Sequence, residues 1–161
     1  MERLEKRFYS CYDPSRVYDF LGSSRKEEKL MGTGSHFSAY KLNVNGLELA
    51  IKVSSNTASD KSQLDLAELE KVLLKLKRLK LPLVPPMEIE FFNDYLLVVQ
   101  PFAEKQIDRY SELWPVFQQK LEEFYKGLRD NDLALVDTIQ GGISCEIPFI
   151  YDFSDLQVLK K

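Results

Sequence analysis

Apolar and polar residues alternate over several short stretches between residues 30 and 101. Residues 40–44 and 47–53 predict a hairpin joined by Asn45-Gly46, because this dipeptide suits the two left-handed positions of a type I′ turn. A preceding strand is expected to begin at residues 29–31. The pattern therefore predicts three antiparallel strands at the start of the fold.

A second hairpin is predicted from residues 87–92 and 95–99, with its turn at Asn93-Asp94. Residues 96–99 are all apolar, which is typical of a strand buried on both faces inside a sheet. The two hairpins and the first strand together predict a five-stranded antiparallel sheet in an α+β fold.

Two helices are predicted by apolar residues spaced three and four apart. The first covers residues 62–81, begins with a capping box from Ser62 to Asp65, and stops at Pro82. The second covers residues 111–128, with Pro115 in its first turn. Their apolar faces comprise Leu69, Val72, Leu73 and Leu76 in the first helix, and Leu113, Phe117, Leu121, Phe124 and Leu128 in the second.

Composition narrows the classes of protein that fit. The chain has 161 residues, a net charge of -3, and no apolar run of membrane-spanning length. The mild acidity argues against a general nucleic-acid binder, and we expect no membrane span. Cys11 and Cys145 form no disulfide framework, so a reduced, cytoplasmic location is expected. The single histidine, His36, excludes a histidine-rich metal site.

The first candidate chemistry lies between residues 32 and 52. Gly32 and Gly34, followed by Ser35, lack the Cβ atoms that would keep a phosphate away from the backbone. Lys52 is flanked by Ile51 and Val53 on a predicted strand, where poor solvation favours an anionic partner. Together they indicate a nucleotide site, although a chance glycine turn and an exposed edge lysine remain the ordinary alternatives.

Carboxylates supply the rest of the candidate chemistry. Glu70 falls among leucines on the first predicted helix, where it would need a cation such as Lys52. Glu68 is the other candidate, and a solvated position at the rim of the helix is the ordinary alternative. Asp137 follows a short apolar strand, and is preferred to Asp130, which falls inside the end of a helix.

Asp152 follows a predicted hairpin of residues 143–145 and 147–151. A carboxylate at the end of an apolar strand offers the hard oxygen that Mg²⁺ prefers, although such an aspartate often only caps a turn. Asp155 is a second candidate ligand.

In this order the motifs resemble those of the protein kinase superfamily. Gly32 and Gly34 match the first two glycines of the glycine-rich loop, with Phe37 in place of the third. Lys52 matches the lysine of the Val-Ala-Ile-Lys strand, and Glu70 its helical partner. The segment Asp152-Phe153-Ser154 is similar to Asp-Phe-Gly.

The resemblance implies roles for further residues. Ala50 would line the nucleotide site, Val99 would gate the back pocket, and Gln100 and Phe102 would contact adenine through their backbones, because Pro101 has no N–H. Asp137 would be the catalytic base and Asp152 the ligand of Mg²⁺. Gly142 departs from the pattern, because it stands where a kinase has its metal-binding asparagine.

The resemblance spans residues 30–156 and implies an atypical minimal protein kinase, similar to the reduced kinases among bacterial secreted effectors. Such a protein would transfer the γ-phosphate of ATP to a protein hydroxyl, of Ser or Thr rather than Tyr. It would have an extension at 1–29 that packs on the body, a first lobe at 30–104, and a truncated, mostly helical second lobe at 105–161.

The missing late helices imply an activating partner protein, and an effector would act in a host cytosol. The main alternative is a pseudokinase that binds a nucleotide or a partner. A small-molecule phosphotransferase and an α+β domain without nucleotide are the others.

Overall fold

The computed structural model describes residues 1–60, 64–136 and 139–159. Its contacts divide the chain into two compact units. The sheet unit comprises Glu2–Ala67 and Pro86–Phe102, and the helix–hairpin unit comprises Met1, Glu68–Pro85 and Ala103–Lys161. The junction after Phe102 lies two residues before the expected end of the first lobe, and residues 68–85 group with the second unit.

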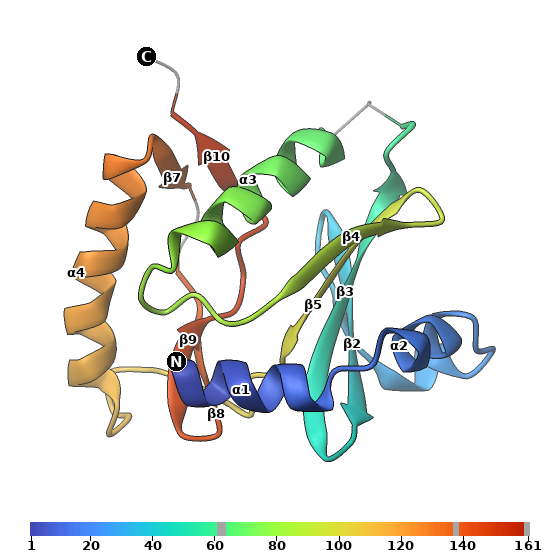
Figure 1. The fold of residues 1–161 in the computed structure, drawn as a ribbon, viewed down its shortest axis with the longest axis horizontal. Coiled ribbons are helices and arrows are strands. Elements are labelled where there is room, and N and C mark those ends of the chain that lie inside the picture. The colour runs from blue at the N-terminus through green and yellow to red at the C-terminus, as the bar shows by residue number, and fades with distance from the viewer. Residues whose placement is uncertain (61–63, 137–138, 160–161) are drawn as a thin grey trace. The chain divides into compact units, whose positions relative to one another are not determined.

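The sheet unit contains the expected five-stranded antiparallel sheet (Figure 1). Its strands are β1 (Leu30–Thr33), β2 (Phe37–Val44), β3 (Leu47–Thr57), β4 (Glu88–Phe92) and β5 (Tyr95–Pro101), in the order β1-β2-β3-β5-β4. Strand β5 lies between two neighbours, and residues 96–99 are buried. The prediction of an apolar interior strand is therefore confirmed.

Both predicted hairpins of the sheet are present. Asn45 and Gly46 have φ values of 52° and 89°, and Asn93 and Asp94 have values of 50° and 68°. Left-handed φ at both central positions is what a type I′ turn requires. The turn residues therefore set the pairing register of β2 with β3 and of β4 with β5.

The N-terminal segment forms two helices, α1 (Glu2–Cys11) and α2 (Pro14–Leu21), and a 3₁₀ turn, η1 (Lys26–Lys29). The sequence predicted its packing but not these helices. Phe8 is fully buried, whereas Tyr9 is 42% exposed. The side-chain amide of Asn45 donates to the Cys11 carbonyl at 2.9 Å, which ties the end of α1 to the β2–β3 turn.

Helix α3 (Leu66–Leu79) begins four residues later than the expected start at 62. Leu66 is the first residue of the buried face, and tertiary packing supports a helix only from the point where that face begins. Ser62 of the expected capping box lies outside the described residues. The predicted apolar face is confirmed, because Leu69, Val72, Leu73 and Leu76 are all buried.

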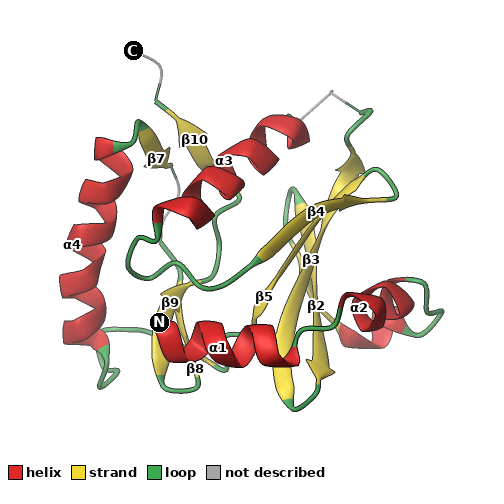
Figure 2. Cartoon of the chain, viewed as in Figure 1, coloured by secondary structure: helices red, strands yellow, loops and turns green. Residues whose placement is uncertain are grey.

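The segment after residue 105 is not mostly helical, which corrects the expectation (Figure 2). Helix α4 (Trp114–Asp130) is its one described helix. The rest forms two small antiparallel sheets, because hairpin and turn residues interrupt it every few positions. The strands are β6 (Lys105–Gln106), β7 (Leu133–Leu135), β8 (Gly141–Ser144), β9 (Ile147–Ile150) and β10 (Leu156–Val158).

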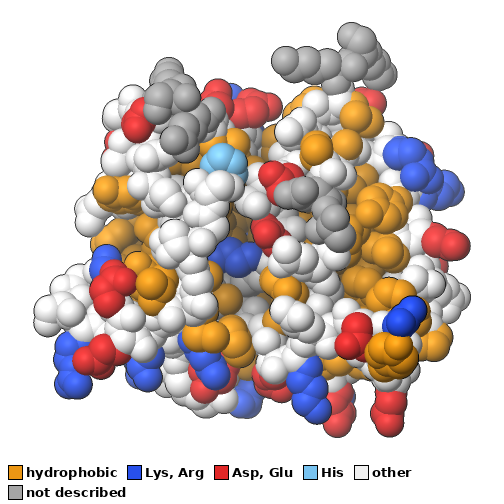
Figure 3. Space-filling view, turned by 180° about the vertical axis from the view of Figure 1, so that it is seen from behind, with side chains coloured by type: hydrophobic (Ala, Val, Ile, Leu, Met, Phe, Trp, Pro, Cys, Tyr) orange, Lys and Arg blue, Asp and Glu red, His pale blue; other side chains and the backbone are white. Residues whose placement is uncertain are grey.

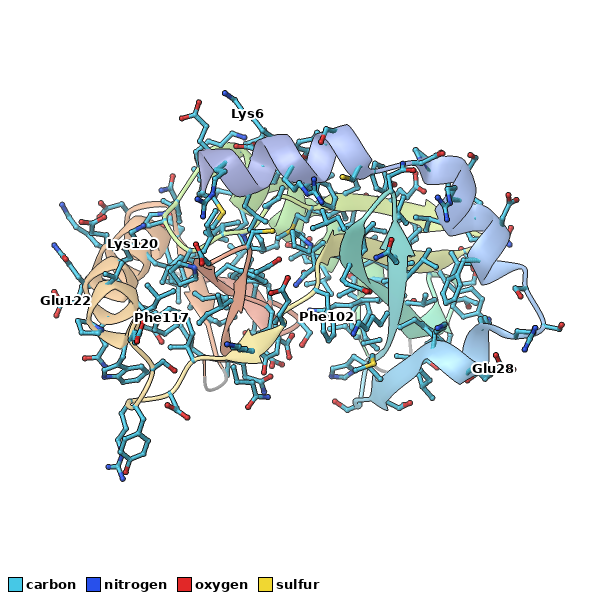
Figure 4. All side chains as sticks on the ribbon, turned by 90° about the horizontal axis from the view of Figure 1, so that it is seen from below. Lys6, Glu28, Phe102, Phe117, Lys120 and Glu122 are labelled. Atoms are coloured by element: carbon cyan, nitrogen blue, oxygen red, sulfur yellow. The ribbon has the colours of Figure 1, made fainter. Side chains whose placement is uncertain are left out.

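Helix α4 packs through one face, as its apolar spacing predicts. Phe117, Phe124 and Leu128 are buried, and Glu122 points away from the strands (Figure 4). A Cβ built on Gly141 would lie only 2.6 Å from Cζ of the Phe117 ring. Glycine at the start of β8 therefore allows the close approach of α4.

The exposed face in Figure 3 carries lysine, arginine, aspartate and glutamate side chains interspersed with one another. None of the described helices is both long and apolar enough to cross a bilayer.

Candidate nucleotide site

One row of paired residues crosses all five strands of the sheet unit. Gly32 pairs with Ala39, Ala39 with Lys52, Lys52 with Val98, and Val98 with Ile89. Directly paired residues project their side chains on the same face of a sheet. Adjacent strands lie about 4.8 Å apart, so Gly32 and Lys52 are about 10 Å apart across β2. The sheet thus brings together the glycine segment and the lysine.

The next row of the same face comprises Lys41, Ala50 and Gln100. Ala39 and Ala50, beside half-buried Lys52, have small side chains. The ammonium of Lys41 lies 4.6 Å from the centre of the Phe102 ring. This face therefore carries two lysines, and its residues Ala50, Val98 and Gln100 are buried.

Neither glycine of the predicted loop is required by the fold. A Cβ on Gly32 would meet no atom within 4 Å, and one on Gly34 would meet only the Phe37 carbonyl at 3.7 Å. Neither residue has a left-handed φ. The N–H of Gly34 donates to the Phe37 carbonyl at 2.8 Å and closes the turn, in which Ser35 is exposed. The open backbone at Gly32 is therefore accessible to a ligand.

Val99 lies on the other face of the sheet. It pairs with Ile51, whereas Val98 pairs with Lys52. Because successive side chains of a strand point to opposite faces, Val98 is the β5 valine that neighbours Lys52. The sequence identified the apolar run, but it could not give the register that distinguishes the two valines.

The expected adenine contacts at the end of β5 already have partners in the sheet. The N–H of Phe102 donates to the Glu48 carbonyl at 2.9 Å. Hydrogen-bonded and non-hydrogen-bonded pairs alternate along an antiparallel ladder. Because Phe102 is bonded to Glu48, the pair two positions earlier, Gln100 and Ala50, is also a hydrogen-bonded pair, and the N–H of Gln100 is directed at Ala50. An adenine base would therefore need different backbone groups, or a local opening of this end of the sheet.

Helix α2 packs on the face opposite Lys52. Tyr18 stacks on Phe92 at 4.9 Å and donates to the Glu90 carboxylate, and Phe20 packs edge-on against Tyr40. The hydrogen bond to Glu90, followed by burial, raises the pKa of Tyr18. Helix α2 thus packs on part of the face opposite Lys52, and a cavity of about 330 Å³ remains on that face, lined by Leu21, Tyr40, Val53 and Phe92 among others.

The predicted carboxylates belong to the helix–hairpin unit. Glu70 is half-buried on α3, next to the buried Leu69. Glu68, its alternative, is exposed. Asp130 is the last residue of α4, which agrees with its place at a helix end. Asp137 lies outside the described residues, so its role as a base stays a prediction, as does the pairing of Glu70 with Lys52.

Asp152 is held by a local turn. Its Oδ1 accepts hydrogen bonds from the N–H of Ser154 at 3.0 Å and from the Ser154 hydroxyl at 2.8 Å. Within the described part of the chain, no donor is bonded to Oδ2. Phe153 is buried, with its ring 6.1 Å from that of Phe124. The turn thus anchors the phenyl ring in the core and leaves one carboxylate oxygen available for a cation.

The two strands β7 and β10 pair with each other, with Leu135 opposite Leu156. The end of β7 and the start of β10 therefore lie side by side. Val136 follows β7 and Asp155 precedes β10 at this end of the small sheet.

Among the described residues, no three His, Cys, Asp or Glu side chains gather in a group that could hold a metal ion. Asp152 can offer one oxygen to a divalent cation, which would need phosphate oxygens and water to complete its coordination. Gly142, where the sequence pattern leads one to expect a metal-binding asparagine, has no side-chain ligand atom.

Comparison of the chain with family models and with curated proteins finds no match in either.

Proposed function

We propose that this chain is a reduced, protein-kinase-like protein that binds ATP and transfers its γ-phosphate to a hydroxyl of a protein substrate. The observation that carries the proposal is the row from Gly32 through Ala39 and Lys52 to Val98. It combines an open glycine backbone, a central cation and small apolar neighbours on one face of a sheet. These three features suit the binding of phosphates and a flat base.

In this proposal Lys52 holds the phosphates, and Glu70 orients Lys52. Asp152 holds Mg²⁺, which neutralises charge on the phosphates when it is bound. Asp137 accepts the proton of the substrate hydroxyl. The hydroxyl oxygen forms a new bond to the γ-phosphorus, the bond from that phosphorus to the β,γ-bridging oxygen breaks, and ADP leaves with the electron pair.

A second candidate is a pseudokinase that binds a nucleotide or a partner protein without transfer. Two observations favour it. The N–H of Phe102 is bonded to Glu48 within the sheet, and Gly142 supplies no ligand where a kinase has asparagine. A nucleotide-binding pseudokinase would share the nucleotide site with the kinase and differ from it only in the transfer step.

Transfer is tested by incubating the protein with ATP labelled at the γ-phosphate, Mg²⁺ and candidate protein substrates. Lys52→Ala and Asp152→Ala are the test variants, and Lys6→Ala on the exposed face of α1 is the control. The catalytic candidate predicts label on protein that both test variants abolish. ATP binding without any transfer would favour the pseudokinase, and unchanged transfer in either test variant would overturn the assignment of residues.

A further inference from the structure

The cavity of about 330 Å³ in the sheet unit lies on the face opposite Lys52. Val53 lines it, and Val53 follows Lys52 on β3, so the two side chains project from opposite faces. All of its described lining belongs to Glu2–Ala67 and Pro86–Phe102, so the cavity lies within one compact unit. A volume of about 300 Å³ is at the small end for cavities that hold organic ligands. The cavity therefore has room for a small organic molecule.

An interruption in the pairing of β3 with β5 lies beside the cavity. The two strands pair directly up to Val53 and again only at Thr57, so residues 54–56 lie opposite the single residue Leu96. There the N–H of Leu96 donates to the hydroxyl of Ser54 at 2.9 Å rather than to a backbone carbonyl. A strand that carries extra residues bends at such a bulge. The hollow is therefore a consequence of the strand pairing itself.

Two aromatic rings of the cavity wall are held in place by α2. Tyr18 stacks on Phe92 with ring centres 4.9 Å apart, and Phe20 packs edge-on against Tyr40 at 5.8 Å. Leu97, which also lines the cavity, is buried. Because these side chains are already ordered by packing, little conformational entropy is lost from the wall when a ligand binds.

Lys26 gives the cavity its charge. It is half-buried in η1, with its ammonium 6.0 Å from the centre of the Tyr40 ring. Within the described part of the chain, no carboxylate forms an ion pair with it. Glu27 follows it in the chain, but Glu27 accepts a hydrogen bond from the Tyr40 hydroxyl at 3.3 Å and does not line the cavity. The described lining thus holds one cation and no aspartate or glutamate.

We propose that this cavity binds a small organic anion with an apolar, ring-sized body and one anionic group of the carboxylate or sulfonate type. The body lies against Val53, Phe92 and Leu97, and the anionic group pairs with Lys26. Neutral donors in the lining supply further hydrogen bonds to the anionic oxygens, and they comprise Ser38, Tyr40, Ser55, Asn93 and Tyr95. The site lies on the other face of the sheet from the proposed nucleotide site and does not depend on it.

The charge of the ligand is tested with two fluorescent probes, anilinonaphthalene sulfonate and phenylnaphthylamine, which has the same rings without the sulfonate. We expect Lys26→Ala to weaken binding of the sulfonate by about fivefold, the scale of one partly screened ion pair, and to leave the uncharged probe unaffected. Lys29→Ala is the control, because it removes the same charge at an exposed position of the same turn. Equal sulfonate affinities of the two variants, or no binding to the wild type, would overturn the proposal.

The place of binding is tested with Ser38→Phe. Ser38 lines the cavity and is the direct partner of Val53, so a phenyl ring there would occupy the space. We expect both probes to lose most of their affinity, with a melting temperature of the free variant that shows it is folded. Undiminished binding to folded Ser38→Phe would overturn the cavity as the site. If that variant does not fold, Lys26→Ala decides the question alone.

Separation from the nucleotide site is tested by competition. An excess of ATP with Mg²⁺ should leave both probes bound to the wild type, and Lys52→Ala should bind them as the wild type does. Displacement by ATP, or loss of both probes in Lys52→Ala, would place them on the Lys52 face and overturn the separate cavity site. A protein that retains the probes but does not bind ATP would overturn the proposed function and leave this inference in place.

Discussion

The carboxylate of Asp152 accepts two hydrogen bonds at a single oxygen, Oδ1, both of them from Ser154. One comes from the backbone N–H and one from the hydroxyl. A glycine at position 154 could provide only the first of them. The serine therefore fixes the orientation of the carboxylate through a local turn, and no described residue donates to Oδ2.

Ser154→Ala removes the hydroxyl donor and keeps the backbone turn. We expect the free energy of unfolding to fall by about 1 kcal/mol, the ordinary net value of one hydrogen bond. We also expect weaker Mg²⁺-dependent ATP binding, because the carboxylate becomes free to rotate. Calorimetric titration of ATP at several Mg²⁺ concentrations measures the second effect. Ser154→Thr, which keeps the hydroxyl, is the control, and equal binding by wild type and Ser154→Ala would contradict the orienting role.

Lys52→Ala should weaken ATP binding by at least tenfold, because it removes the cation at the centre of the sheet face. Lys6→Ala changes the net charge by the same amount on an exposed helix, so it controls for the general electrostatic field. Fluorescence titration with a labelled ATP analogue measures both. Similar affinities for the two variants would show that the nucleotide does not contact Lys52.

Gly46→Ala should destabilise the protein by about 1–2 kcal/mol, because φ at this position is 89° and a Cβ there is strained. The same turn carries Asn45, whose amide holds the end of α1, so the effect should extend to the N-terminal helices. Urea unfolding measures the loss, and hydrogen exchange of α1 locates it. Gly22→Ala is the control: φ at position 22 is -83°, which any residue adopts, so this change should alter the stability little.

Alkaline pH should destabilise the sheet unit through Tyr12. Burial is the first cause that raises the pKa of Tyr12, and the charges of Glu90 and Glu88 raise it further. The folded state therefore keeps a proton that the unfolded chain loses near pH 10. This stabilisation is complete below that pH and is lost as the pH rises above it.

Tyr12→Phe keeps the ring that stacks on Phe8 at 5.4 Å and removes the ionisable hydroxyl. We expect the free energy of unfolding of this variant to fall less between pH 9 and 11 than that of the wild type, measured by urea unfolding at several pH values. Parallel curves for the two proteins would exclude Tyr12 as a cause of the alkaline loss.

The sheet could be predicted from the sequence because local chemistry specifies it. Asn45-Gly46 and Asn93-Asp94 determine two turns, and the apolar run at 96–99 marks the interior strand. The N-terminal helices were not predicted, although Leu4, Phe8 and Cys11 recur at the i, i+4, i+7 spacing of a helix and are buried in α1. The start of α3 was placed four residues too early, because a capping pattern competes poorly with the packing that begins at Leu66.

The candidate site was harder to predict, because it depends on pairing register and close packing. The sequence identified Gly32 and Lys52, but only the register shows that they share a row and that Val98 replaces Val99 beside the lysine. Nothing in the sequence places Lys26 beside the same cavity as Val53 and Leu97, since all three are far apart along the chain. Such contacts arise from the fold, and no local motif indicates them.

The most direct test of the nucleotide site is a thermal-shift titration with ATP, with and without Mg²⁺, on the wild type and on Asp152→Ala. A ligand that binds only the folded state stabilises it by about 2.7 kcal/mol at a hundredfold excess over its dissociation constant. We predict a rise in melting temperature that depends on Mg²⁺ in the wild type and is lost in Asp152→Ala. An unchanged melting temperature in all four conditions would contradict the nucleotide site.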